Sequence, residues 1–196
     1  MNIEDYLSDI PEYIKIAMYK AIERNGEEYI KAVYSAHKGH LKAAKKAHKL
    51  IDKESEEILK KNPVNCKKGC SYCCHVHIYI SQDEAQLIIN HCNHNSIDIN
   101  IERLRKQQNI GIEDWIKQPI EKAQCVFLKD NECQIYNIRP MTCRKFFVAS
   151  DPKFCDITTI NRIAILNNIK VELFVASIFD VREHGSMPDM LIKYLK

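Results

Sequence analysis

The sequence predicts a single, mainly α-helical domain with a small cysteine-rich β-hairpin element. Three observations support this fold class. The chain has 196 residues, 45% of them hydrophobic and 28% charged, which is the usual composition of one globular domain. Apolar residues recur at helical spacing near both ends of the chain. Segments with strand-like alternation are short and lie among the cysteines. We therefore expect an N-terminal helical region over residues 1–62, a cysteine-rich core over 63–156, and a C-terminal helical region over 157–196 that packs on the core.

The N-terminal region is expected to contain a first helix that ends near Asn25-Gly26, followed by one long amphipathic helix over about residues 27–60. Side chains from Ile30 to Ile58 recur in alternating steps of four and three, and Pro63 prevents continuation. The other face of this helix carries eight lysines: Lys38, Lys42, Lys45, Lys46, Lys49, Lys53, Lys60 and Lys61. Such a face is either solvated or contacts an acidic protein partner.

Short elements are expected in the first half of the cysteine-rich core. Residues 75–80 alternate between polar and apolar side chains, which predicts a short strand. Ser81 and Glu84 have the spacing of a capping box, so a helix should begin there and run to about residue 91.

The second half of the core is expected to contain a β-hairpin and a helix. Residues 125–128 and 133–136 have the pattern of two short strands around a turn. Pro140 is tolerated in a first helical turn, so a helix that carries Cys143 should follow. Residues 160–179 are apolar enough for one or two core helices.

Composition excludes several classes of function. The five glycines are scattered singly, whereas loops that bind nucleotide phosphates need clustered glycines. The formal charge of +3 gives no support to a nucleic-acid or membrane partner. The N-terminus lacks the basic and apolar regions of a secretory signal, and no apolar run reaches the roughly 18 residues of a spanning helix. We therefore expect a cytoplasmic protein.

The nine cysteines are the strongest functional signal. In a reducing compartment an odd number of thiols favours metal ligation or redox chemistry over a disulfide framework. Thiolates are soft ligands that select zinc, iron–sulfur clusters or copper(I). Short spacings let successive sulfurs converge on a centre about 2.3 Å away. A closed four-thiolate zinc site would also stabilise the fold.

Eight of the cysteines fall into two groups of four. The first group lies within nine residues and comprises Cys66, Cys70, Cys73 and Cys74. The second comprises Cys125, Cys133, Cys143 and Cys155, which must converge through the hairpin and the helix after it. We expect all eight to be metal ligands, either in two sites or in one polynuclear site. Cys92 remains as the ninth cysteine.

The spacing of Cys66, Cys70 and Cys73, with Tyr72 before the last, also matches the loop of radical S-adenosylmethionine enzymes. Those enzymes mount the loop on a β/α barrel, and this chain lacks alternating strands and helices after Cys74. We therefore reject that assignment. The match still indicates that this loop can hold a [4Fe–4S] cluster, so we favour an iron–sulfur cluster over zinc.

The composite pattern resembles a known family. Cys66-x3-Cys70-x2-Cys73-Cys74, the later segments that begin at Cys125 and Cys133, and the segment Arg139-Pro140-x2-Cys143-Arg144 are similar to the YkgJ-like cysteine-cluster family. The resemblance implies a chelated zinc or iron centre and, for most members, no defined reaction. Flagellin lysine N-methylases also belong to the family, so a protein-modifying enzyme is one alternative. A structural zinc module that presents the lysine-bearing helix to a partner is another.

Several other residues have both a structural and a functional interpretation. His75 and His77 either complete the metal site or belong to a short extended segment. His37 and His48 fall on the apolar stripe, where hydrogen-bonded core histidines are the common outcome. Arg139 and Arg144 either pair with carboxylates or offset thiolate charge and hold an anionic substrate. An apolar shell around the sulfurs is expected from Tyr72, Tyr136, Phe146 and Phe147.

Overall fold

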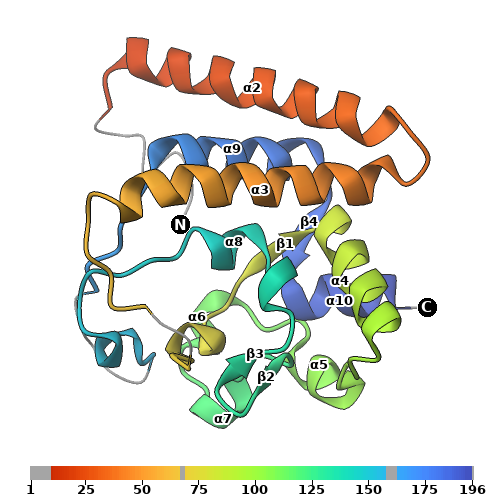
Figure 1. Cartoon of the computed structure of the whole chain (residues 1–196). Coiled ribbons are helices and arrows are strands. Elements are labelled where there is room, and N and C mark those ends of the chain that lie inside the picture. Colours follow the sequence, from red (N-terminus) through yellow and green to blue (C-terminus); the bar gives the residue numbers. More distant parts are fainter. Residues whose placement is uncertain (1–9, 67–68, 158–162, 196) are drawn as a thin grey trace.

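The computed structural model describes residues 10–66, 69–157 and 163–195. It confirms a mainly α-helical fold, and the strands in these residues form two small two-stranded antiparallel sheets. The helix α2 (Glu12–Tyr34) packs on both α3 (Gly39–Leu59) and α9 (Ile169–Val181), and these three helices form an upper helical layer above most of the other elements (Figure 1). Among the described residues, no helix combines the length and apolar character needed to cross a bilayer.

The expected long helix over residues 27–60 is wrong, because the chain reverses between Tyr34 and Gly39 and forms a hairpin of two helices (Figure 1). Lys38 has a left-handed backbone with φ of 55°. A Cβ at position 39 would lie 2.0 Å from the carbonyl oxygen of Val33, so glycine is required where the two helices meet. The stripe predicted for this segment holds in α3, where Ala44 and His48 are buried, but not in α2, where Tyr34 is 76% exposed.

The expected helix end at Gly26 is also wrong, because α2 continues through this residue. Gly26 faces α9, and an added Cβ would lie 2.7 Å from Cγ1 of Val181 and 3.3 Å from the carbonyl oxygen of Ser177. The glycine therefore serves the close packing of two helices. The expected residues of the first helix before position 10 lie outside the described residues.

Below the helical layer, a small sheet joins the two halves of the chain. Strand β1 (Tyr79–Ser81) pairs antiparallel with β4 (His184–Ser186), and Ile80 lies opposite Gly185. The expected strand over residues 75–80 is therefore shorter and later, and the 3-10 helix η1 (Tyr72–His75) precedes it. The capping box of Ser81 and Glu84 is confirmed at the start of α4 (Gln82–Asn95), which continues four residues beyond the predicted end.

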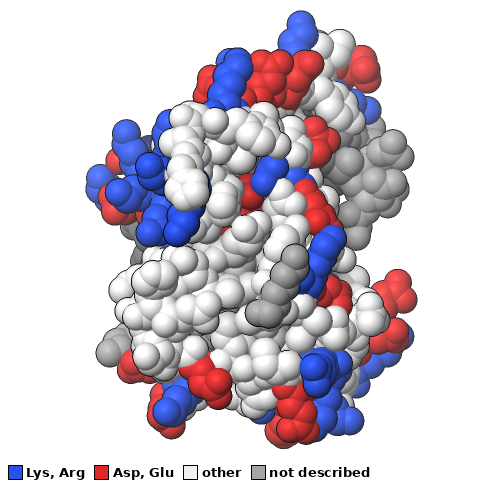
Figure 2. Space-filling view, turned by 90° about the vertical axis from the view of Figure 1, so that its right-hand side faces the viewer, with Lys and Arg blue, Asp and Glu red and all other residues white. Residues whose placement is uncertain are grey.

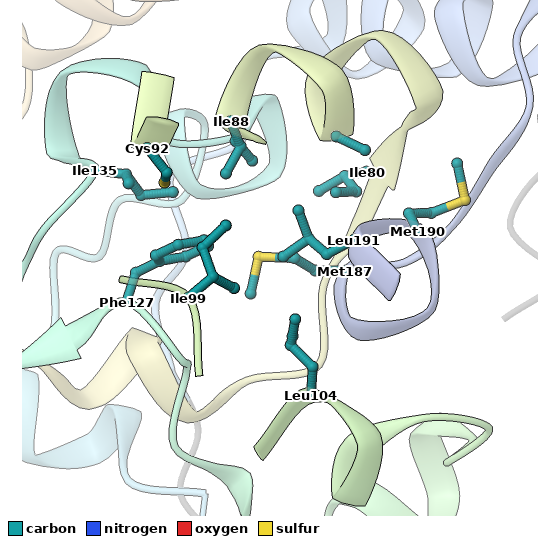
Figure 3. Packing of buried hydrophobic residues seen from close by; sticks show 11 residues of the cluster. Ile80, Ile88, Cys92, Ile99, Leu104, Phe127, Ile135, Met187, Met190 and Leu191 are labelled. Atoms are coloured by element: carbon teal, nitrogen blue, oxygen red, sulfur yellow. The ribbon is translucent and has the colours of Figure 1, made fainter. Parts of the chain in front are cut away.

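The lower core gathers apolar side chains from α4, α5 (Ile101–Gln107) and α10 (Met187–Tyr194), together with the loop before the hairpin. Figure 3 shows Ile88, Phe127, Ile135 and Leu191 packed around one another in this core. Two further short helices, α6 (Ile112–Trp115) and α7 (Ile120–Ala123), connect α5 to the hairpin.

The hairpin predicted around residues 125–136 is confirmed in shortened form. Strands β2 (Leu128–Lys129) and β3 (Glu132–Cys133) are joined by Asp130 and Asn131, which both have positive φ values. Asp and Asn tolerate this backbone, and two such residues form the turn that matches the twist of paired strands. The 3-10 helix η2 (Tyr136–Ile138), the short helix α8 (Met141–Arg144) and the 3-10 helix η3 (Pro152–Cys155) follow.

A set of buried polar side chains joins the helical layer to the elements below it. We call this set the polar seam, and it comprises Tyr29, His48, Asp83, Glu84 and Arg182. Glu84 accepts hydrogen bonds from the backbone N–H of Met141 at 2.7 Å and contacts Nε2 of His48 at 3.0 Å. Asp83 accepts two hydrogen bonds from Arg182, at 2.8 and 2.6 Å, and one from the hydroxyl of Tyr29 at 3.0 Å. His48 is thus a hydrogen-bonded core histidine, as its position on the stripe predicts.

Candidate metal centre

One cavity of about 680 Å³ brings together the two groups of cysteines. Its lining includes Cys66, Cys70, Cys73, Cys74, Cys125, Cys133, Cys143 and Cys155. No disulfide joins any of the nine cysteines, all of which lie in the described part of the chain. Cys92 is 1% exposed and lies in the lower core beside Ile135, away from this lining (Figure 3). The structure therefore separates the ninth cysteine from the other eight.

Backbone contacts place the end of the first cysteine group against the hairpin. The N–H of Cys125 donates to the carbonyl oxygen of Cys74 at 2.7 Å. The hydroxyl of Ser71 donates to Oδ1 of Asn131 in the hairpin turn at 3.2 Å. In the hairpin, Cys133 pairs with Leu128, whose N–H donates to the carbonyl of Cys125. Cys73 and Cys74 therefore lie next to the two hairpin cysteines.

The beginning of the first group lies against a different segment. Asn65 precedes Cys66, and its N–H donates to the carbonyl oxygen of Val148 at 3.4 Å. Its side-chain amide donates to the carbonyl oxygen of Ala149 at 3.1 Å. The 3-10 helix η3, which ends at Cys155, contacts η1, which carries Cys73 and Cys74. Cys66 thus follows a residue that is bound to the segment 148–149, and Cys155 lies against the end of the first cysteine group.

The electrostatics of the thiols indicate the same neighbourhoods. Burial raises the pKa of Cys125 to about 12, and the pKa of Cys143 is raised by burial and by its neighbours Cys125, Cys73 and Cys133. Burial raises the pKa of Cys155 to about 11, and the thiols of Cys66, Cys70 and Cys73 act in the same direction. Cys73 therefore interacts both with Cys155 and with the thiols of the hairpin and α8, and the neighbouring thiols combine cysteines from both groups in the sequence.

Cys73 differs from the other thiols because its pKa is lowered to about 7. A hydrogen bond with Cys74 stabilises its thiolate, and the positive charge of Arg139 acts in the same direction. The same hydrogen bond raises the pKa of Cys74. A lowered thiol pKa increases the fraction of thiolate, which is the form that binds metals.

The eight thiols are suitable ligands for a thiophilic metal, although they are not arranged around a common point. Among the residues that the structure describes, no group of three or more histidine, cysteine, aspartate or glutamate side chains is arranged to hold one ion. A tetrahedral ion with sulfur ligands at about 2.3 Å occupies a sphere of only about 50 Å³. The cavity is much larger than one such ion and has room for a polynuclear cluster or for two separate centres.

The two arginines beside Cys143 have different roles. Arg144 is 3% exposed, pairs with Asp52 at 2.6 Å, and donates to the carbonyl oxygens of Asn137 and Arg139. It therefore takes the structural role. Arg139 lines the cavity, lies over the ring of Tyr136 at 4.0 Å, contributes to the lowered pKa of Cys73, and opposes the effect of burial, which raises the pKa of Cys133. The structure thus places the charge of Arg139 beside the thiols.

The other predicted residues are divided between the cavity and the surface. Tyr136, Phe146 and Phe147 line the cavity as expected, whereas Tyr72 does not. His77 lines it and His75 does not, and His37 is exposed in the turn between α2 and α3. Sequence reasoning missed several lining residues, among them Gln107, Trp115 and Met187. Their distance from the cysteines along the chain gives no local signal that could have found them.

Comparison with protein families gives one match. Residues 65–163 match the model of the CxxCxxCC family, whose description is "Putative zinc- or iron-chelating domain". The chain belongs to this family. No curated protein and no solved structure matches the chain.

The match to the CxxCxxCC family includes all eight cysteines of the cavity and leaves out the hairpin of α2 and α3. The chain departs from the pattern in the family name, because three residues separate Cys66 from Cys70 instead of two. Residues 67 and 68 of this loop lie outside the described residues. Gly69 has a φ of 84°, a backbone conformation that favours glycine, just before Cys70.

Proposed function

We propose that the chain binds zinc or iron, and that the eight cysteines of the cavity supply the ligands. One observation carries this proposal. Eight cysteines spread over 90 residues, from Cys66 to Cys155, line the same cavity, whereas Cys92 lies in the apolar core. An unselected set of buried thiols would not separate in this way. The family match supports the same class of ligand.

The metal is held in two neighbouring subsites that combine cysteines from both groups of the sequence. The hairpin subsite contains Cys73, Cys74, Cys125, Cys133 and Cys143, and the distal subsite contains Cys66, Cys70 and Cys155. The hydrogen bond between Cys125 and Cys74 supports the first grouping. The contacts of Asn65 with residues 148 and 149, and the effect of Cys66 and Cys70 on the pKa of Cys155, support the second. Small movements of the loops would be needed to close each subsite around its metal.

An iron–sulfur cluster is favoured over zinc for the hairpin subsite. This subsite contains five thiols, and the cavity exceeds the space that one tetrahedral ion fills. Tyr136, Phe146 and Phe147 would limit the access of water to the sulfurs, and Arg139 would offset part of the thiolate charge. A reducing cytoplasm would keep the thiols available for such a centre.

The first experiment is elemental analysis and visible absorption of the full chain after anaerobic purification. We expect a brown protein with bound iron. Colourless protein with stoichiometric zinc would replace the cluster with zinc sites, and protein without either metal would overturn the proposed function.

Single Cys→Ser variants at Cys133 and Cys155 should each lose part of the metal, because each disables one subsite. Loss of all metal from both variants would contradict two subsites. Cys92→Ala is the matched control, and its metal content should equal that of the unchanged chain.

A second candidate role is the binding of an acidic protein on α3. Lys42, Lys45, Lys46, Lys49 and Lys53 are exposed, and within the described part of the chain none of them has an ion-pair partner. Figure 2 shows basic side chains gathered on its left edge, the side that Figure 1 turns toward the viewer. This candidate predicts that full-length protein binds a poly-glutamate column until about 0.2 M salt, since exposed charges are screened within about 8 Å at that ionic strength. Substitution of Lys42, Lys46 and Lys49 by Gln should abolish retention, and unchanged retention would contradict the role of this face.

A further inference from the structure

A second part of the cavity lies next to the thiols and has a different character. We call it the side chamber and define it by Val76, His77, Gln107, Trp115, Ala123 and Met187, all of which line the cavity. The charged residues of the cavity lining are Glu132, Arg139 and Lys145, and none belongs to the side chamber. Apolar lining with a few polar atoms is the usual composition of a site for a small molecule.

Contacts hold these walls together independently of any metal. The indole N–H of Trp115 donates to the carbonyl oxygen of His75 at 2.8 Å. The rings of Trp115 and His77 make an edge contact with centroids 5.1 Å apart. Gln107 is anchored through its Nε2, which donates to the carbonyl oxygens of Lys122 and Gln124, on either side of Ala123. The walls are thus formed by residues 76–77 together with one residue each from α5, α6, α7 and α10.

Two of these walls carry buried polar atoms without a partner. Gln107 is 2% exposed, and its Oε1 accepts no hydrogen bond from the described residues. Because both amide hydrogens of Gln107 are directed to backbone carbonyls, the positions of its oxygen and nitrogen are fixed by that network. Both ring nitrogens of His77 are also buried and make no hydrogen bond of good geometry with the described residues, although the carbonyl of Ile110 lies near the ring.

The Oε1 atom of Gln107 has no donor among the described residues, and the ring nitrogens of His77 lack well-formed hydrogen bonds. A buried acceptor without a donor costs about 1–3 kcal/mol, so native proteins rarely leave one empty. Burial lowers the pKa of His77, although the nearby Ile110 carbonyl and Asp189 carboxylate act in the opposite direction. A neutral imidazole presents one donor and one acceptor. The side chamber therefore offers two acceptors and one donor inside an apolar enclosure.

We propose that the side chamber binds an uncharged small molecule with an amide-type polar edge and a flat apolar body. An N–H of the ligand would donate to Oε1 of Gln107, its carbonyl would accept from His77, and its apolar body would lie against Trp115 and Met187. This binding site is additional to the thiol site, and its occupation does not depend on the metal. Its position beside Cys74 and Cys125 would place the ligand next to any bound centre.

The test uses benzamide as the probe and N,N-dimethylbenzamide as its matched control, added to the full chain with its metal as isolated. Trp115 is the single tryptophan of the chain, so its fluorescence reports on the side chamber directly. We expect benzamide to change this fluorescence in a saturable manner, with about tenfold weaker binding of the dimethyl analogue because it has no N–H donor. Equal binding of the two compounds, or no saturable response to either, would overturn the proposal.

Two variants separate this site from the metal site. Ala123→Leu should fill the side chamber and abolish benzamide binding while the metal content stays unchanged. His77→Phe preserves the ring contact and should weaken benzamide binding several-fold, again with unchanged metal. His94→Phe, at an exposed histidine of α4, is the control and should bind benzamide normally. Loss of metal from His77→Phe would instead assign His77 to the metal centre and contradict its role in the side chamber.

Discussion

The polar seam and the cysteine cavity both contain buried polar groups. Only in the seam does each of these groups have a hydrogen-bond or ion-pair partner within the described part of the protein. Asp83 is 0% exposed and has three donors, from Arg182 and Tyr29. Glu84 is 1% exposed and contacts Met141, His48 and the N–H of Ser81. Across the cavity, Gln107 and His77 have buried atoms without partners, and the thiols surround a space of about 680 Å³.

This difference distinguishes the region that stabilises the fold, the seam, from the region that would bind ligands, the cavity. A buried polar group without a hydrogen-bond partner destabilises the folded state. A region in which the protein supplies all of these partners therefore stabilises the fold without a bound ligand. The seam is such a region, and it joins α2, α3 and α9 to α4. The cavity is a region that a metal and a small molecule would complete. We therefore expect the two regions to respond to different perturbations.

The largest expected effect is that of metal removal. Metal binding to a site that is not preformed is coupled to folding, so a chelator should loosen the loops that carry the cysteines. Hydrogen exchange should become faster by at least about tenfold in η1, the β2–β3 hairpin and η3. Exchange in α2, α3 and α9 should stay nearly unchanged, because their contacts lie in the seam and the helical core.

Mass spectrometry of peptides after exchange gives the measurement, with EDTA-treated and untreated samples of the same preparation. The Cys92→Ala variant is the control and should show the same pattern as the unchanged chain. Equal acceleration in the helical layer and in the cysteine loops would mean that the metal stabilises the whole molecule. The comparison between the two regions would then fail.

Local signals in the sequence predicted a substantial part of this arrangement. The capping box at Ser81 and Glu84 and the hairpin turn at Asp130 and Asn131 depend on residues that are close in the chain, and both were predicted. The capping box and the turn are each fixed by neighbours within a few residues. Cys92 is set apart because it falls outside the cysteine pattern of the family, and it lies in the lower core.

The break between α2 and α3 was not predicted, because the apolar periodicity continues across it. The spacing that begins at Ile30 runs through Tyr34 and His37 into α3, although both of these side chains are exposed in the structure and α2 buries Tyr29 and Val33 instead. Gly39 was the available signal, but its role depends on the approach of Val33, which only the folded hairpin shows. The regrouping of Cys155 with Cys66 and the roles of Gln107 and Trp115 in the cavity depend on long-range contacts in the same way.

A smaller effect, confined to stability, is expected from Glu84→Ala. This change removes the acceptor for Met141 N–H, the partner of His48 and half of the capping box, and it leaves other buried groups unpaired. We expect a loss of about 3–5 kcal/mol in the free energy of unfolding, measured by urea denaturation of the metal-loaded chain. Glu57→Ala is the matched control at an exposed position, where the pair with Lys60 contributes no measurable stability.

The metal content of the Glu84→Ala protein distinguishes a purely stabilising role of Glu84 from a role in the metal site. Glu84 contacts the first residue of α8, which carries Cys143, so it is the point where the seam comes closest to the thiols. If the seam acts only on stability, the folded variant should retain its full metal content. A reduced metal content at a urea concentration where the variant is fully folded would show that Glu84 also positions Cys143. The seam would then be part of the metal site, because it would set the geometry of one of its ligands.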